Sequence, residues 1–379
     1  MLRAMTNPAP ERRREQCPRV MRARRALAWL LLVGGWQIAA MPVARAEDIV
    51  VAAITPRQGS AQSEPGIIAA VSSALADIAK SGGLLGRPVR LVMYTEDCSR
   101  ADAETTAGQI VARGASLVIG HICSAAAIAA APVYARNRIV LISPGARSPR
   151  LTEPRAGPTV FRLAGREDRF GAETATLIAG RFAGRRVAIV HDKSAQARTL
   201  ADAADRELRM RGITPVLREA YVAGEREYNK TIEALAAAEV GVVVIPAQPL
   251  EAGIILDGLR TRKIDVALIG SEILAVPEIE AKAKLAGPGI ILMLPWSPAA
   301  TRQTPESASA TLMRAGIEVW AHAVRRTQTL DPEAVSRSLE TESASTALGA
   351  LRFNLKGDAL IPSFAPHTWV DDRWQALAP

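Results

Sequence analysis

The chain alternates short apolar runs with helical segments, and this alternation restricts it to one class of fold. Residues 48–54 form a β-branched run, and residues 65–83 carry apolar positions at helical spacing between an initial proline and a final Gly-Gly. These patterns predict a buried strand followed by a helix with clear start and stop signals. The alternation continues through strands at 87–97, 116–120 and 138–144 and helices at 100–114 and 124–137. Such a succession predicts a parallel sheet with right-handed crossovers and helices on both faces.

The same alternation restarts after Phe161 and predicts a second lobe. Helical and apolar segments again succeed one another as far as Trp296, with expected strands at 185–192, 213–222, 239–247, 265–272 and 287–296. After a polar stretch, residues 311–328 predict a long helix, and Asp331 followed by proline predicts the N-terminus of another. We interpret two stretches of the tail, within residues 347–374, as one closing β-hairpin.

The expected fold class is therefore α/β: two doubly wound parallel-sheet lobes joined by hinge strands. We assign residues 47–165 and 297–343 to lobe 1, and residues 166–296 and 344–379 to lobe 2. A chain of this length exceeds one typical hydrophobic core and suits two domains.

The first 46 residues have the order of a secretory signal peptide. A basic segment at 21–25 precedes an apolar run at 26–41, and Ala44-Arg45-Ala46 forms a small-x-small cleavage site. The apolar run is short for a membrane span and is interrupted by a glutamine and two glycines. We expect an exported protein cleaved after Ala46. The alternative is an N-terminal anchor that stays attached.

Removal of this leader would also remove most of the excess positive charge. The whole chain has a formal net charge of +9, but residues 1–46 hold nine Lys/Arg and only two Asp/Glu. The mature chain would be close to neutral. Its sequence has no cluster of Lys/Arg interleaved with aromatic residues, so nucleic acid is not an expected partner.

Cys98 and Cys123 are the two cysteines that would remain after cleavage. In an oxidising exported compartment, an even number of cysteines indicates a disulfide. The alternative is a catalytic thiol at Cys123 with His121 as its base, since residues two apart on a strand point the same way. Export favours the bridge.

The residues that follow each expected strand are the candidate binding site, because open parallel sheets bind ligands outside the carboxyl ends of their strands. Two such stretches, 121–127 and 142–149, are polar and rich in small residues. Each leads toward a helix or turn whose free backbone N–H groups can hold an anion. Glu272 follows a buried strand of the second lobe. This combination predicts a zwitterion held between the lobes.

Enzyme classes lack their motifs in this sequence. The first strand is not followed by G-x-G-x-x-G, and Walker A and G-x-S-x-G are also missing. The His and Cys spacings of zinc sites are absent, and no Ser/His/Asp set can be assembled. We therefore expect a binding protein without catalytic residues, cofactor or metal.

Five features carry a family resemblance: the two cysteines, VIGHICS (118–124), SPGARSP (143–149), AIVHDK (188–193) and IGSE (269–272). In this order and spacing the chain resembles the periplasmic substrate-binding proteins of branched-chain amino acid ABC transporters, the Leu/Ile/Val-binding type with the type I periplasmic binding fold. The resemblance implies a periplasmic monomer that closes on an amino acid or related polar ligand and delivers it to permease and ATPase subunits. A ligand sensor that presents a small amide or organic acid to a signalling partner is the alternative.

The resemblance also implies roles for individual residues. Cys98 and Cys123 match the family's disulfide. Cys123 and Ser124 match positions that line the site of the ligand's α-carboxylate, and Gly145 and Ala146 match backbone donors of the next loop. Two further candidate ligand residues are Arg147, where threonine is usual, and Glu272, which matches the partner of the ligand's ammonium group.

Several candidate positions depart from the family pattern and predict a ligand more polar than leucine. Gln196 and Gln248 stand where the family has aromatic residues, and Glu318 stands near the place of an apolar aromatic. Buried hydrogen-bonding groups need partners, which a leucine side chain lacks. Open alternatives are a surface position for Arg147, a structural ion pair for Glu272, and a solvated helix face for Glu318. Gln62 and His322 are further departures from the family pattern. His191 and Asp192 are expected to cap the helix that follows them.

Overall fold

The computed structural model describes residues 47–57, 66–286, 289–297 and 307–377. The expected signal peptide and Gln62 lie outside the described residues. From Asp48 onward the described residues belong to one compact unit. None of the helices in these ranges combines the length and hydropathy that a membrane crossing requires.

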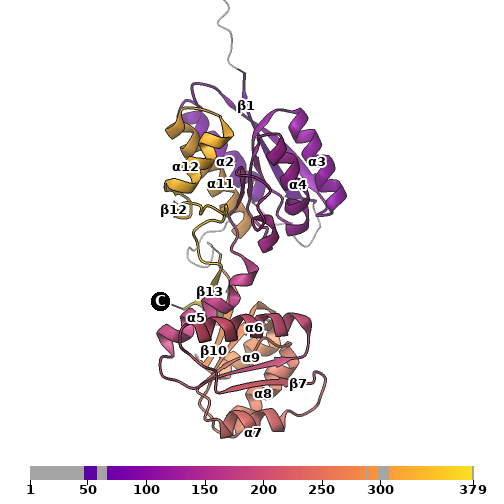
Figure 1. The fold of residues 1–379 in the computed structure, drawn as a ribbon, viewed down its shortest axis with the longest axis vertical. Helices are drawn as coiled ribbons and strands as arrows, with labels where there is room; N and C mark the ends of the chain where they lie inside the picture. Colours follow the sequence, from indigo (N-terminus) through magenta and orange to yellow (C-terminus); the bar gives the residue numbers. More distant parts are fainter. Residues whose placement is uncertain (1–46, 58–65, 287–288, 298–306, 378–379) are drawn as a thin grey trace, which may run out of the picture. The chain divides into compact units, whose positions relative to one another are not determined.

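The first sheet has five parallel strands in the order β2-β1-β3-β4-β5. The strands are β1 (Ile49–Pro56), β2 (Val89–Glu96), β3 (Ala115–Ile119), β4 (Val140–Ser143) and β5 (Val160–Arg162), with helices α2 (Ile67–Lys80), α3 (Arg100–Ala112) and α4 (Ser124–Arg136) between them (Figure 1). This confirms the predicted β–α–β succession of the first lobe.

Strand β1 shows why the first sheet is buried on both faces. Ile49, Val51 and Ala53 pack in one hydrophobic cluster with α2. Their neighbours Val50 and Ala52 pack in another with α3 and α4. Because successive side chains of a strand point to opposite faces, a strand covered on both sides must be apolar throughout.

The second sheet has seven strands in the order β14-β13-β10-β9-β8-β6-β7. Five are parallel: β6 (Val187–Asp192), β7 (Leu217–Tyr221), β8 (Val242–Val244), β9 (Ala267–Ser271) and β10 (Ile290–Pro295). The helices are α5 (Phe170–Arg181), α6 (Ala195–Met210), α7 (Asn229–Ala237), α8 (Pro249–Thr261) and α9 (Pro277–Ala286). Two hydrophobic clusters cover this sheet as well. The α/β class with two sheets is thus confirmed.

The tail forms two hairpins, so the prediction of a single hairpin is wrong. Strands β11 (Ala344–Thr346) and β12 (Gly349–Leu351) pair with each other, whereas β13 (Phe364–Val370) pairs with both β14 (Arg373–Ala376) and β10. The β13–β14 hairpin extends the parallel sheet by an antiparallel edge.

Two C-terminal helices, α11 (Ala308–Thr327) and α12 (Pro332–Thr341), pack with the first sheet. The Asp331 Oδ2 atom accepts a hydrogen bond from the Ala334 N–H at 2.9 Å and caps α12 as predicted. Leu351 and Phe353 lie in the same hydrophobic cluster as α11. This differs from the expected division, which placed residues 344–379 together in lobe 2.

Within the described residues, three segments that leave one sheet for the other come together at Ser363. The Trp296 N–H donates to the Ser363 carbonyl at 3.1 Å, and the Arg166 N–H donates to Ser363 Oγ at 3.0 Å. Gly165 is required here, because a Cβ at this position would lie 2.3 Å from the Cα of Ser363.

Candidate functional site

A disulfide between Cys98 and Cys123 confirms the predicted bridge, with the two Cα atoms 5.5 Å apart. It joins the loop after β2 to the loop after β3. His121 is fully buried: its Nδ1 lies 2.6 Å from Glu96 Oε2 and its Nε2 lies 3.0 Å from the Tyr134 hydroxyl. The thiol–histidine alternative therefore fails, because Cys123 is bonded to Cys98 and both ring nitrogens of His121 have other contacts.

The loop after β4 is held against the N-terminus of α4. Ser124 Oγ accepts hydrogen bonds from the Arg147 N–H at 3.0 Å and the Ser148 N–H at 3.1 Å. Ser143 Oγ likewise accepts from the Ala146 N–H at 3.2 Å. Two of the backbone and side-chain groups expected to bind ligand, Ala146 N–H and Ser124 Oγ, thus serve to fix the loop.

Gly145 lets these two loops approach. A Cβ on Gly145 would lie 2.6 Å from Ile122 Cγ2 and 2.7 Å from the Ile122 carbonyl oxygen. The fold therefore brings five predicted site residues together at adjacent strand ends: Cys123, Ser124, Gly145, Ala146 and Arg147.

A cavity of about 960 Å³ lies beside this loop. Arg147, Gln196 and Glu272 line it, so three predicted ligand residues from different strand ends share one space. Gln196 also lines a small hollow with Gln248 and Ser271. Gln196, Gln248 and Glu272 are all exposed in this structure.

The guanidinium of Arg147 stacks on an aromatic ring inside the cavity. It lies 4.7 Å from the centroid of the Phe364 ring. Burial lowers the pKa of Arg147, while the charges of Glu272 and Glu167 act in the opposite direction. Among the described residues, neither carboxylate forms an ion pair with it. Arg147 is therefore partly buried rather than a freely solvated surface residue.

Glu318 has structural partners. Its Oε1 lies 2.8 Å from Arg314 Nε on the same helix, and its Oε2 accepts from the Ala347 N–H at 2.6 Å. These contacts join α11 to the β11–β12 turn. The expectation that His191 and Asp192 cap α6 is wrong: the cap is Ser194, whose Oγ accepts from the Ala197 N–H at 3.2 Å, and Asp192 instead accepts from the Ser194 N–H at 2.8 Å.

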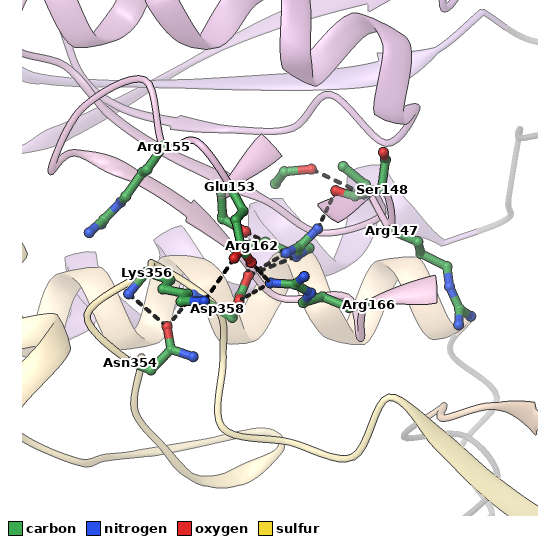
Figure 2. Close-up of polar contacts among 12 residues, drawn as sticks. Arg147, Ser148, Glu153, Arg155, Arg162, Arg166, Asn354, Lys356 and Asp358 are labelled. Carbon is green, nitrogen blue, oxygen red and sulfur yellow. Dashed lines mark hydrogen bonds and ion pairs between the residues drawn. The ribbon is translucent and has the colours of Figure 1, made fainter. Parts of the chain in front are cut away.

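A buried polar cluster next to the Arg147 loop was not predicted from the sequence. Arg162 is fully buried and donates to the Ser148 carbonyl, to Thr152 Oγ1 and to Asp358 Oδ1. Thr152 Oγ1 also donates to Asp358 at 2.7 Å. Figure 2 shows these side chains converging on Asp358, while Arg147 extends away from them.

The charges in this cluster are balanced. Arg166 contacts Glu153 at 2.7 Å and the second oxygen of Asp358 at 3.4 Å. Burial alone would raise the pKa of Asp358, but the charge and hydrogen bonds of Arg162 outweigh it and the pKa is lowered. Burial lowers the pKa of Arg162. The one sequence feature that could have indicated this cluster is Arg162, an arginine at the end of the short apolar strand β5. No sequence feature indicated that Phe364 would reach the cavity.

Comparison with known proteins agrees with this architecture. A family model described as "Periplasmic binding protein" matches residues 48–361. The Leu/Ile/Val-binding protein of Escherichia coli strain K12 is 27% identical, over 89% of this chain and 95% of that protein. The leucine-, isoleucine-, valine-, threonine- and alanine-binding protein of Pseudomonas aeruginosa is also 27% identical, over 79% of this chain and 83% of that protein.

Solved structures show the same fold. An ABC transporter substrate-binding protein from Desulfitobacterium hafniense in complex with leucine has a TM-score of 0.65 and 20% identity, over 87% of this chain and 100% of that chain. A branched-chain amino acid transporter substrate-binding protein from Streptococcus pneumoniae, bound to isoleucine, has a TM-score of 0.56 and 17% identity, over 88% of this chain and 100% of that one. Since the family model extends from β1 to the last connection before β13, the chain belongs to the periplasmic binding protein family.

Proposed function

We propose that this protein is the solute-binding component of an ABC importer that captures an amino acid or a related small polar organic ligand. Family membership supports the binding role, and the relatives that bind branched-chain amino acids support the ligand class. Delivery to a membrane permease follows from the role of such proteins in ABC transport.

One observation carries the proposal: Arg147 and Glu272 line the same cavity from strand-end loops of different sheets. The lining also holds Arg206 and the carboxylates of Glu167, Asp168 and Asp202, so protein groups of both charges face one space, which suits a ligand that itself carries both charges. The cavity, of about 960 Å³, is within the size range of small-molecule sites. It also lies at the carboxyl ends of parallel strands, where open α/β sheets bind ligands.

The amide side chains at the cavity favour a ligand more polar than leucine. Gln196 lines the cavity, and Gln248 lies beside it at the start of α8. On closure such groups lose water and must regain hydrogen bonds from the ligand. A branched aliphatic side chain cannot supply them.

The mechanism is binding coupled to a change in lobe position, without covalent chemistry. Ligand contacts from both lobes stabilise a closed state and shift the population toward it. The three connections that meet at Ser363 are the segments about which such closure would occur.

The test is to identify by mass spectrometry the small molecules released from the purified protein, and then to titrate them by calorimetry. We expect a polar, charged solute. Leucine, isoleucine and valine are measured alongside, and micromolar binding of any of them would contradict the polar-ligand assignment. Absence of both a co-purified solute and binding to an amino acid panel would contradict the binding function.

A further inference from the structure

Arg147 differs from the other buried or partly buried arginines of its neighbourhood in having no carboxylate partner among the described residues. Arg155 pairs with Glu340 at 2.7 Å, Arg162 with Asp358, and Arg166 with Asp168 at 2.6 Å. The Arg147 guanidinium contacts the ring of Phe364, and no ion pair or side-chain hydrogen bond of this guanidinium is present among the described residues. Figure 2 shows Arg147 extending away from the cluster around Asp358 that holds Arg162 and Arg166.

The charges of Glu167 and Glu272 favour the charged form of this guanidinium, but neither carboxylate forms an ion pair with it, so a bound anion would stabilise it further. Arg147 is partly buried and lines the cavity, so it has lost part of its hydration. The Phe364 ring fixes one face of the planar group, which leaves its hydrogen-bonding edge free. A planar fork of this kind matches a carboxylate with two parallel hydrogen bonds.

Three hydrogen bonds hold the backbone at Arg147 and Ser148 in place. Its N–H donates to Ser124 Oγ at 3.0 Å, and its carbonyl accepts from the Glu167 N–H at 3.0 Å. The next carbonyl, that of Ser148, accepts from the buried Arg162. A residue held in this way needs little ordering when it binds, and this increases affinity.

We propose that Arg147 binds a second anionic group of the ligand, so that the solute is a small dicarboxylate such as an acidic amino acid. This inference rests on the proposed binding function. In this proposal the ligand's first carboxylate binds the backbone N–H groups of the first turn of α4, because Ser124 Oγ already accepts two loop N–H groups. The guanidinium lies over Phe364, at the far end of the Arg147 side chain from that loop. The two anionic groups of one small ligand would therefore bind at two separate points of the protein.

The test compares ligand pairs that differ in one charge: glutamate with glutamine, aspartate with asparagine, and glutarate with its monoamide. Calorimetry on the mature protein is expected to give the acidic member of one pair an affinity about tenfold or more higher, as a charge-assisted bidentate contact provides. Arg147→Thr should remove this preference, and Arg147→Lys should keep part of it because the charge remains without the fork.

The control is Arg150→Gln, which removes an exposed arginine three residues further along the same loop. It should leave the preference unchanged. Thermal unfolding of each variant separates a binding defect from a folding defect. Equal binding of acidic and amide members by the wild type would overturn the inference and leave the binding function intact. An unchanged preference in a folded Arg147→Thr variant would also overturn it, whereas no binding of any solute would contradict the proposed function itself.

Discussion

The guanidinium of Arg147 lies 4.7 Å from the centroid of the Phe364 ring, although the two residues come from different sheets. Arg147 follows β4 of the first sheet, and Phe364 begins β13 of the second. Phe364 is also packed edge-on against Phe170 at the start of α5. The ring therefore joins the core of the second sheet to a cavity-lining residue of the first.

This contact predicts that Phe364→Leu weakens ligand binding through Arg147. Loss of the ring removes a cation–π contact of about 0.5–1 kcal/mol and frees the guanidinium. We expect a several-fold lower affinity for the acidic solute, measured by calorimetry. Because Phe364 is buried, the unfolding free energy of the Phe364→Leu variant is measured in parallel. The double variant with Arg147→Thr should bind no more weakly than Arg147→Thr alone, and an additive loss would show that Phe364 acts elsewhere.

Glu272→Gln should weaken binding strongly while leaving stability unchanged. The side chain is exposed and has no ion pair with a described residue, so its removal breaks no contact in the free protein. If it binds the ligand's ammonium group, the loss is about 1.5–3 kcal/mol, or about ten- to hundredfold in affinity. Glu278→Gln, an exposed change in α9, is the matched control. Normal calorimetric binding by Glu272→Gln would remove Glu272 from the site.

The main architecture could be predicted because local sequence determines it. β1 is apolar from Ile49 to Ile54 because both of its faces are covered, and helices between the strands carry clear start and stop signals. The disulfide followed from cysteine number and expected compartment. Arg147, Gln196 and Glu272 were expected near one another because each follows the carboxyl end of a strand, and open α/β sheets bind ligands beyond these ends.

Other features could not be predicted, because they depend on pairs far apart in the chain. Arg162 and Asp358 are 196 positions apart, and neither lies in a motif. The strands β11 and β12 have three residues each, too few to show a period, so their packing with α11 was not foreseen. Phe364 reaches Arg147 only because β13 pairs antiparallel with β10.

Removal of the disulfide should destabilise the first lobe but leave the ligand-binding side chains, Arg147 and Glu272, present. The bond closes a loop between positions 25 residues apart, which corresponds to roughly 3 kcal/mol of unfolded-state entropy. The Cys98→Ser/Cys123→Ser variant should therefore unfold at lower urea concentration. Reduction of the wild type with dithiothreitol should give the same shift. Unchanged unfolding midpoints in both cases would mean that the bridge contributes nothing to stability.

Gly145→Ala should separate the two loops of the candidate site. The added Cβ would meet both the side chain and the carbonyl of Ile122, and a backbone atom cannot move aside cheaply. Overpacking of this kind costs about 1–3 kcal/mol. We expect lower thermal stability together with weaker ligand binding. Gly180→Ala in α5, where a Cβ meets open space, is the control and should be neutral or slightly stabilising.

Asp358→Asn should lower stability at neutral pH and reduce the sensitivity of the protein to acid. In the wild type the carboxylate faces the buried Arg162, which holds the pKa of Asp358 below its ordinary value. The resulting stabilisation is present above the unfolded-state pKa of about 3.9 and is lost as the pH falls through the lower folded-state pKa. The asparagine variant lacks this titration and leaves Arg162 unpaired, a loss of about 3 kcal/mol or more. Urea unfolding between neutral and acid pH measures both effects. Asp265→Asn, whose side chain is 95% exposed, is the control. An acid dependence equal to that of the wild type in Asp358→Asn would show that other carboxylates determine the acid limit.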